Sequence, residues 1–245
     1  MANLPSKILL IISQACLILR FHMPYFYEDC ILEIAFLLDS SESAKDYNHE
    51  QQKKFVLATV DRMKSLQLSS GRTLSWRMAL LQYSSTVLIE QTFHDWKGPE
   101  AFKSHIGPIT YIGHGTYTTY AITNLTQLYM TEGTLGSVKV AVLFTDGVDH
   151  PRNPDIFAAT ADAKHQGIVF FTMGMTRVAE EGSNAAKLRL LASVPASRFK
   201  EFEIIIGTYV KNVGHLLIRP LCQSTGCLSL PTIQILPGKI FEVGN

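Results

Sequence analysis

The chain has 245 residues, of which 47% are apolar and 18% are charged, and its formal net charge is +1. These values are typical of a folded domain with a buried core, and they exclude extended disorder. Lysine and arginine form no long run interleaved with aromatic residues, so we expect no nucleic-acid partner.

The N-terminal segment is typical of a secretory signal peptide. Lys7 precedes an apolar run at residues 8–19, which has the length of a signal-peptide core and is too short to span a bilayer. We therefore expect residues 1–22 to be a signal peptide, the chain to be secreted, and no other segment to span a membrane. A buried strand or helix before the domain is the alternative, because no small-x-small cleavage site follows the run.

Strands and helices are predicted to alternate from residue 31 onward. Short apolar runs predict strands at residues 31–38, 76–83, 86–91, 138–145, 167–174 and 198–202. Helical spacing of apolar side chains predicts helices at residues 45–66, 98–106, 118–129, 154–164, 184–192 and 203–221, the fourth opened by Pro154. This alternation predicts an α/β fold: a doubly wound, mostly parallel sheet with helices on both faces and one antiparallel edge strand.

Oxygen-bearing side chains stand at the predicted strand ends in three loops. Asp39, Ser41 and Ser43 form a D-x-S-x-S motif after the first strand, Thr116 precedes the helix at 118–129, and Asp146 follows the strand at 138–145. In a doubly wound sheet, ligands bind outside the carboxyl ends of the strands. Carboxylates and hydroxyls without imidazole or thiolate suit Mg²⁺, and neutral hydroxyls leave the ion able to accept a carboxylate from a partner.

These three motifs resemble the metal-ion-dependent adhesion site of the von Willebrand factor A domain family. The resemblance implies that Ser41 and Ser43 ligate Mg²⁺ directly, with Mn²⁺ as an alternative ion, and that Thr116 binds directly or through water. It also implies that Asp39 and Asp146 act largely through water, and that an Asp or Glu of the partner takes the sixth position. The sequence therefore predicts a metal-bridged contact with a protein partner.

The resemblance covers about residues 30–222, which leaves residues 223–245 as a tail or truncated region. Two positions depart from the family pattern, because Thr119 replaces a glycine and His114 stands where another glycine is common. Neither change removes a ligand. Within the family, the segments AFLLDSSESA and LQYSSTVLIEQTF are most similar to A domains of matrix collagens, although the chain contains no Gly-X-Y repeat.

The cysteines and one sequon suggest extracellular modifications. Cys16 lies in the predicted signal peptide, and a bridge between Cys30 and Cys222 would join the two ends of the domain. Cys227 is then left over, which suggests an intermolecular bond and an oligomer, or an alternative pairing. Asn124 begins the N-x-T sequon on a predicted helix, and we expect its side chain to face solvent as a glycosylation site.

Several other interpretations compete with the metal site. Ser and Asp before a helix also serve as helix caps, which would explain D-x-S-x-S without a metal. The chain has no D-x-D after its first strand, no G-x-S-x-G elbow and no phosphate-binding loop, so we expect no enzymatic activity. His114 and His150 lie near the metal loops, where we expect them to modulate partner binding rather than catalyse.

The sequence therefore predicts a secreted adhesion module of the extracellular matrix. Its expected partner is a matrix protein or a cell-surface receptor that offers an acidic residue to the bound Mg²⁺. The alternative is a structural assembly module of a collagen-like matrix protein, whose contacts would not depend on metal.

Overall fold

The computed structural model describes residues 30–65, 73–193 and 199–201. The predicted signal peptide, the predicted helix at 203–221 and the tail lie outside the described residues. So do Cys222, Cys227 and the side chain of Cys30, so the disulfide remains a prediction.

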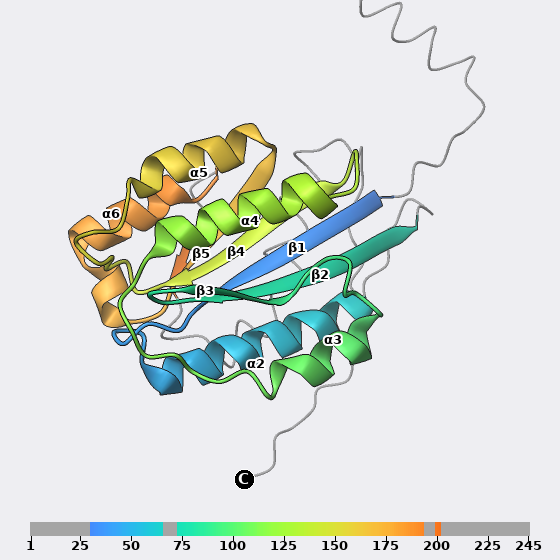
Figure 1. Ribbon diagram of the computed structural model, residues 1–245, viewed down its shortest axis with the longest axis horizontal. Helices are drawn as coiled ribbons and strands as arrows, with labels where there is room; N and C mark the ends of the chain where they lie inside the picture. Colours follow the sequence, from blue (N-terminus) through green and yellow to red (C-terminus); the bar gives the residue numbers. More distant parts are fainter. Residues whose placement is uncertain (1–29, 66–72, 194–198, 202–245) are drawn as a thin grey trace, which may run out of the picture.

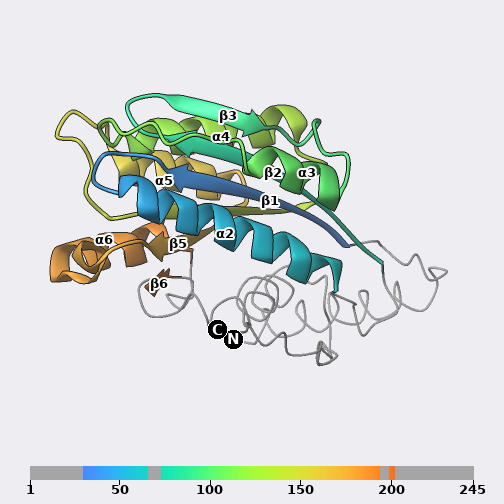
Figure 2. The same cartoon turned by 90° about the horizontal axis from the view of Figure 1, so that it is seen from below.

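The described residues form a six-stranded sheet in the order β3-β2-β1-β4-β5-β6. Strands β1 to β5 are labelled in Figure 1, and β6 is labelled in Figure 2. The strands are β1 (Cys30–Asp39), β2 (Leu74–Tyr83), β3 (Val87–Gln91), β4 (Val138–Thr145), β5 (Ile168–Gly174) and β6 (Phe199–Glu201). Every neighbouring pair is parallel except β2 with β3, which forms an antiparallel hairpin at one edge. The predicted fold class is thus confirmed, including its antiparallel edge.

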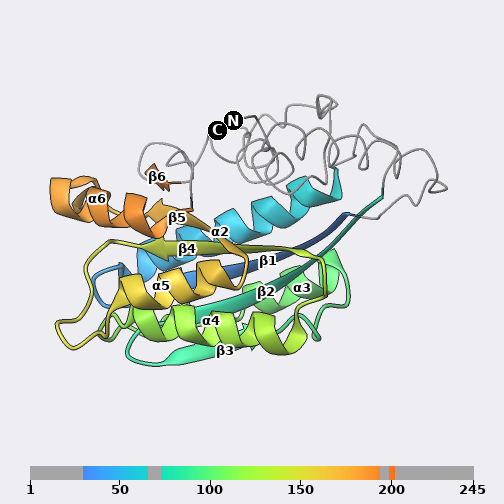
Figure 3. The ribbon, with the colours of Figure 1, turned by 90° about the horizontal axis from the view of Figure 1, so that it is seen from above.

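Helices cover both faces of this sheet. They are α2 (Lys45–Lys64), α3 (Pro99–Ile106), α4 (Thr118–Glu132), α5 (Ile156–His165), the short 3₁₀ helix η1 (Arg177–Glu180) and α6 (Gly182–Leu191). Helices α2 and α3 lie on one face, as seen in Figure 2, and α4 and α5 lie on the other, as seen in Figure 3. None of the described helices is long and apolar enough to cross a membrane.

Strand β1 is buried on both faces, which explains its nearly continuous apolar sequence. Alternate side chains point to opposite faces of a strand. Accordingly, Ile34 and Phe36 belong to the core under α2, whereas Ala35 and Leu37 belong to the core under α4. This central strand is therefore held rigidly between two cores, and its carboxyl end is a fixed platform for a site.

Helix α5 begins later than the sequence pattern predicts. We expected Pro154 to open it, but the first helical residue is Ile156 and Asp155 is the N-cap. The Asp155 carboxylate accepts hydrogen bonds from the backbone N–H groups of Phe157 (2.9 Å) and Ala158 (3.2 Å). This side-chain cap satisfies two free amides at the helix start, and it fixes the first helical residue two positions after the proline.

The chain order in the sheet reverses between β1 and β4, and the two strands part at their carboxyl ends. Strand β1 pairs with β4 only as far as Leu37, opposite Leu143. On its other side it pairs with β2 as far as Asp39, opposite Tyr83. This is the switch point where ligands bind in open α/β sheets.

Candidate metal site

The five candidate ligands lie at the switch point. Asp39 is the last residue of β1, and Ser41 and Ser43 lie in the turn between β1 and α2. Thr116 stands two residues before α4, and Asp146 directly follows β4. The structure therefore brings residues that are up to 107 positions apart to the carboxyl edge of two neighbouring strands.

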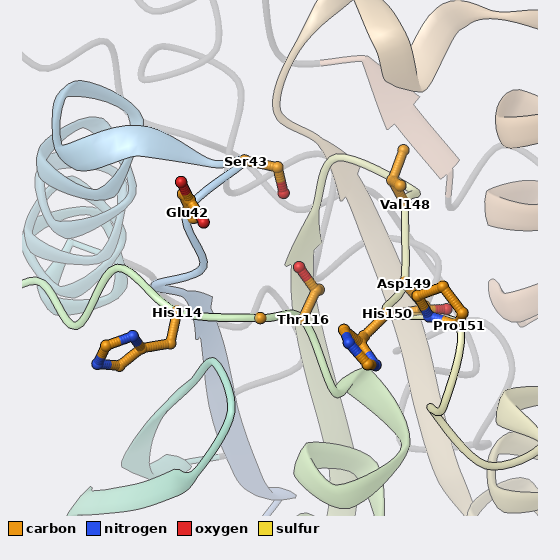
Figure 4. Close-up of a pocket in the computed structure, with 9 residues that line it drawn as sticks. Glu42, Ser43, His114, Thr116, Val148, Asp149, His150 and Pro151 are labelled. Carbon is orange, nitrogen blue, oxygen red and sulfur yellow. The ribbon is translucent and has the colours of Figure 1, made fainter.

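An open depression of about 360 Å³ marks this edge. Its lining comes from the same three loops, and comprises Glu42, Ser43, His114, Gly115, Thr116, Val148, Asp149, His150 and Pro151. In Figure 4 the hydroxyls of Ser43 and Thr116 point toward one another across the depression, whereas the ring of His114 points away from it. The depression is therefore a place where an outside group can reach the hydroxyls.

The carboxylate of Asp39 is buried and only half satisfied. One oxygen accepts a hydrogen bond from the backbone N–H of Ser41 at 2.9 Å, but the other has no hydrogen-bond partner among the described residues. Burial raises the pKa of Asp39 to about 7, and the nearby carboxylate of Asp146 adds to that rise. A buried carboxylate without a partner is costly, and a cation is the group that would satisfy it.

The hydroxyls complete an oxygen donor set. The Oγ atoms of Ser41 and Ser43 lie 3.2 Å apart, with Ser41 buried and Ser43 exposed. Where the chain is described, no three His, Cys, Asp or Glu side chains gather to hold a metal, so any ion here depends on the hydroxyls. Two carboxylates with three hydroxyls are hard ligands, and these residues fit Mg²⁺.

The helix-cap interpretation of D-x-S-x-S finds no support in the contacts of this loop. The N-cap of α2 is Ala44, and no side chain caps the helix start. The Asp39 carboxylate instead folds back on the Ser41 amide within its own loop. The side-chain oxygens of the motif are thus not used to cap α2.

The segment before Thr116 braces the serine loop. Two contacts involve Ser40: its Oγ accepts a hydrogen bond from the Ile112 N–H at 2.7 Å, and its carbonyl accepts one from the Gly113 N–H at 2.9 Å. The hydroxyl of Tyr111 donates to the Ser41 carbonyl at 2.8 Å. Tyr111 was not predicted from the sequence, because a tyrosine in a loop carries no pattern that reveals its partner.

The loop after β4 is ordered by contacts of its own. The carboxylate of Asp146 accepts a hydrogen bond from the Val148 N–H at 2.9 Å. Asp149 accepts a hydrogen bond from the Thr118 hydroxyl at 2.5 Å and pairs with Lys187, so its charge is already balanced. This leaves Asp146 as the carboxylate of the loop that is available beside Asp39.

His150 supports the threonine loop from the side. Its backbone N–H donates to the Thr116 carbonyl at 2.8 Å, and its ring stacks on Tyr117 with centroids 4.8 Å apart. Thr119, which departs from the family pattern, donates its hydroxyl to the Pro154 carbonyl at 2.8 Å. Both residues therefore tie the threonine loop to the segment after β4.

The predicted glycosylation site is exposed. Asn124 lies on α4 with its side chain at the surface, while the neighbouring Leu125 is buried. The Asn124 amide donates to the Tyr120 carbonyl at 2.8 Å. The predicted orientation is thus correct, and glycosylation itself stays a prediction.

Comparisons with known proteins agree with this fold. The family model for the von Willebrand factor type A domain matches residues 33–205. Matrilin-1 of Gallus gallus is 30% identical over 218 residues, covering 87% of this chain and 41% of that protein. The collagen alpha-1(VI) chain of Homo sapiens is 32% identical over 164 residues, covering 61% of this chain and 16% of that protein.

A solved structure shows the same architecture at low sequence identity. Proximal thread matrix protein 1 from the mussel byssus, with a zinc-occupied MIDAS motif, is 17% identical. It aligns with a TM-score of 0.60, over 77% of this chain and 48% of that one. The chain spans less than half the length of the matrix relatives it matches. Because the family model covers most of its residues, the chain belongs to the von Willebrand factor type A domain family.

Proposed function

We propose that this chain is a secreted adhesion module of the extracellular matrix that binds a protein partner through a Mg²⁺ ion. The observation that carries the proposal is the buried, half-satisfied carboxylate of Asp39, which lies beside a second carboxylate and the serine hydroxyls. The homologous matrilin and collagen VI chains are extracellular matrix proteins, which supports the setting.

Each candidate residue has a defined role in this proposal. Ser41, Ser43 and Thr116 would hold the ion through their hydroxyls, while Asp39 and Asp146 would hold it largely through water. The ion, when bound, supplies a positive charge at the surface of the depression. The three neutral hydroxyls leave that charge partly uncompensated, so the favoured ligand is an Asp or Glu of a matrix protein or a cell-surface receptor.

The donor set favours Mg²⁺ or Mn²⁺ over zinc. The mussel byssus relative has a structure with zinc in this motif, which supports the capacity of the fold for a divalent ion. Zinc sites in proteins are usually built from cysteine and histidine, and the candidate ligands here include neither. Carboxylate and hydroxyl oxygens are the ligands of the harder ions.

We further propose that the module has no catalytic activity. The Nδ1 atom of His150 accepts a hydrogen bond from the Arg152 N–H at 3.1 Å, and its ring is stacked on Tyr117. This ring is thus engaged in holding the loop, which supports a positioning role. Because two segments resemble the A domains of matrix collagens, we also propose that this chain is the amino-terminal A domain of a type XXVIII collagen.

A metal-independent assembly module is the second candidate. It is favoured by the edge strand β3, where the adjacent Leu88 and Ile89 are 46% and 44% exposed. An exposed apolar edge strand can pair with another chain without any metal. Sensitivity of partner binding to metal removal separates the two functions.

The test is binding of the secreted full chain to immobilised matrix proteins in Mg²⁺ and in EDTA. Asp39→Ala removes the buried carboxylate, and Asp162→Ala removes an exposed carboxylate on α5 as the matched control. We expect binding to disappear in EDTA and in Asp39→Ala, and to persist in Asp162→Ala. Binding that survives both treatments would contradict metal-bridged adhesion and favour the assembly module.

A further inference from the structure

A buried glutamine of α2 holds both backbone groups of Asp39. The Asp39 N–H donates to the Gln52 Oε1 at 2.7 Å, and the Gln52 Nε2 donates to the Asp39 carbonyl at 2.8 Å. Gln52 is completely buried. Its carboxamide therefore makes a paired, two-point contact with one residue of β1, the residue that carries the half-satisfied carboxylate.

This contact takes the place of backbone pairing with β4, which ends before Asp39. The Ser40 N–H donates to the Tyr83 carbonyl of β2 at 2.9 Å, so this N–H faces β2. Adjacent residues of a strand present their backbone groups to opposite sides, so the N–H of Asp39 faces the β4 side. The ladder with β4 has already ended at Leu37, opposite Leu143. The Gln52 carboxamide therefore takes the place of a β4 peptide group.

The replacement has a structural consequence at the switch point. Without Gln52, a buried N–H and a buried carbonyl of Asp39 would be unpaired, which the fold strongly disfavours. With it, β1 stays extended to its last residue while β4 diverges. The carboxylate of Asp39 is then held close enough to that of Asp146 for their charges to interact.

We propose that Gln52 is a positioning residue of the metal site, which fixes the Asp39 backbone where β1 and β4 part. This inference rests on the proposed function, because it assigns Gln52 a role toward the same ion. Residues that orient metal ligands from behind typically change metal affinity by roughly 10- to 100-fold when they are replaced. Gln52 acts through Asp39 and makes no contact with the ion itself.

The test is Mn²⁺ binding to the full chain with Gln52→Met, which keeps the side-chain volume and removes both hydrogen bonds. Thr59→Val is the matched control, because Thr59 is equally buried on α2 and its hydroxyl donates only to the Phe55 carbonyl of the same helix, at 2.8 Å. Isothermal titration calorimetry gives the Mn²⁺ affinity, and thermal unfolding in EDTA gives the metal-free stability.

We expect Gln52→Met to weaken Mn²⁺ binding at least tenfold and Thr59→Val to leave it within twofold. A merely structural role would lower the unfolding temperature of Gln52→Met without changing its Mn²⁺ affinity, and that result would overturn the inference. Unmodified protein that binds no Mn²⁺ would refute the proposed function and this inference together. Unmodified protein that binds Mn²⁺ as tightly as Gln52→Met would refute this inference alone.

A second measurement does not depend on the variant folding. Hydrogen exchange of the Gln52 side-chain amide is followed by NMR in the unmodified chain, with and without Mg²⁺. Because the carboxamide holds the residue that faces the ion, we expect Mg²⁺ to slow this exchange by at least threefold. Exchange at an unchanged rate in saturating Mg²⁺ would contradict a link between Gln52 and the metal site.

Discussion

Strand β1 carries a buried carboxylate near each end, and the two differ in how completely the surrounding residues satisfy them with hydrogen bonds. Glu33, near the start, accepts hydrogen bonds from Arg77 at 2.6 and 2.9 Å, from the Thr134 N–H at 3.0 Å and from the Ser137 hydroxyl at 2.7 Å. Asp39, at the other end, leaves one oxygen without a partner in the described part of the chain. Both side chains are completely buried.

The difference appears in the direction of the two pKa shifts. Burial acts to raise the pKa of Glu33, but the hydrogen bonds from Thr134, Ser137 and Arg77 outweigh it and hold the pKa below its usual value. At Asp39 burial and the neighbouring Asp146 prevail, and the pKa rises. A carboxylate that stabilises the sheet is fully paired by the fold, whereas one that awaits an outside cation is left incomplete.

The largest expected effect comes from removing the cation that pairs with Glu33. Arg77→Met would leave the Glu33 charge buried without its cation, so we expect the free energy of unfolding to fall by about 3–5 kcal/mol. Mn²⁺ affinity should stay within twofold, because Glu33 and Arg77 lie at the opposite end of β1 from the metal site. Urea denaturation and calorimetry measure the two quantities.

The control for this variant is Lys103→Met on α3. Lys103 pairs with Asp61 at 2.7 Å in a contact that is far more exposed. Exposed ion pairs contribute roughly 0–1 kcal/mol, so this change should have little effect. If both variants lost the same free energy of unfolding, the buried Glu33–Arg77 pair would contribute no more to stability than the exposed Asp61–Lys103 pair.

Neutralising Asp39 should change the free energy of unfolding in the opposite direction. Asp39→Asn removes a buried charge that has no cation in the metal-free chain, so we expect the free energy of unfolding in EDTA at pH 7.5 to rise by about 2–4 kcal/mol. Mn²⁺ binding should be lost in the same variant. Denaturation of Asp39→Asn in EDTA, beside the exposed Asp162→Asn, measures the gain, and a loss of stability would refute it.

The pH dependence sharpens the same comparison. Because the native pKa of Asp39 is about 7, against about 4 in an unfolded chain, native protein keeps a proton between these values that the unfolded chain releases. The Asp39 contribution to stability is therefore present below pH 4 and is lost as the pH rises through 7. For Glu33 the sign is reversed, since its contribution is present above pH 4.5 and is lost as the pH falls through its lowered pKa.

The measurement is the difference in free energy of unfolding between the metal-free chain and Asp39→Asn from pH 4 to 8. The difference isolates Asp39 from His49, whose pKa is lowered by burial and whose contribution falls as the pH drops below 6.5. We expect the advantage of Asp39→Asn to grow as the pH rises. A constant difference over this range would show that Asp39 titrates normally.

The two ends also differ in what the sequence reveals. The candidate ligands were predictable because hydroxyls and carboxylates directly at strand ends form a recognisable motif with a known location in α/β sheets. The ion pair of Glu33 was not predictable, because Glu33 stands inside an apolar run and its partner Arg77 is 44 residues away. Nothing local to either residue predicts that pair.

Gln52 was missed for a related reason. A polar residue on a helix is ordinarily interpreted as solvent-facing, and only the early end of the β1–β4 ladder gives its carboxamide a buried backbone partner. The start of α5 was misplaced because Pro154 is a stronger pattern than the Asp155 cap that follows it. Periodicity predicts elements well, whereas contacts between distant backbone and side-chain groups require the folded chain.

The smallest expected effect concerns the backbone of the two ends. In the turn beside Thr134 and Ser137, the positive φ of 80° falls on Gly136, whereas beside the serine loop a φ of 65° falls on Lys45, the non-glycine residue with positive φ among the described residues. Left-handed backbone costs a non-glycine residue about 1–2 kcal/mol, and the greater freedom of unfolded glycine offsets part of the gain. Lys45→Gly should therefore raise the free energy of unfolding by about 0.5–1 kcal/mol.

The matched variant Lys54→Gly, at an exposed helical position of α2, should lower it by a similar amount. Urea denaturation of both variants measures these changes. Backbone strain at Lys45 predicts that the free energy of unfolding rises in Lys45→Gly and falls in Lys54→Gly. A fall in both variants would show that contacts of Lys45 outweigh its backbone strain.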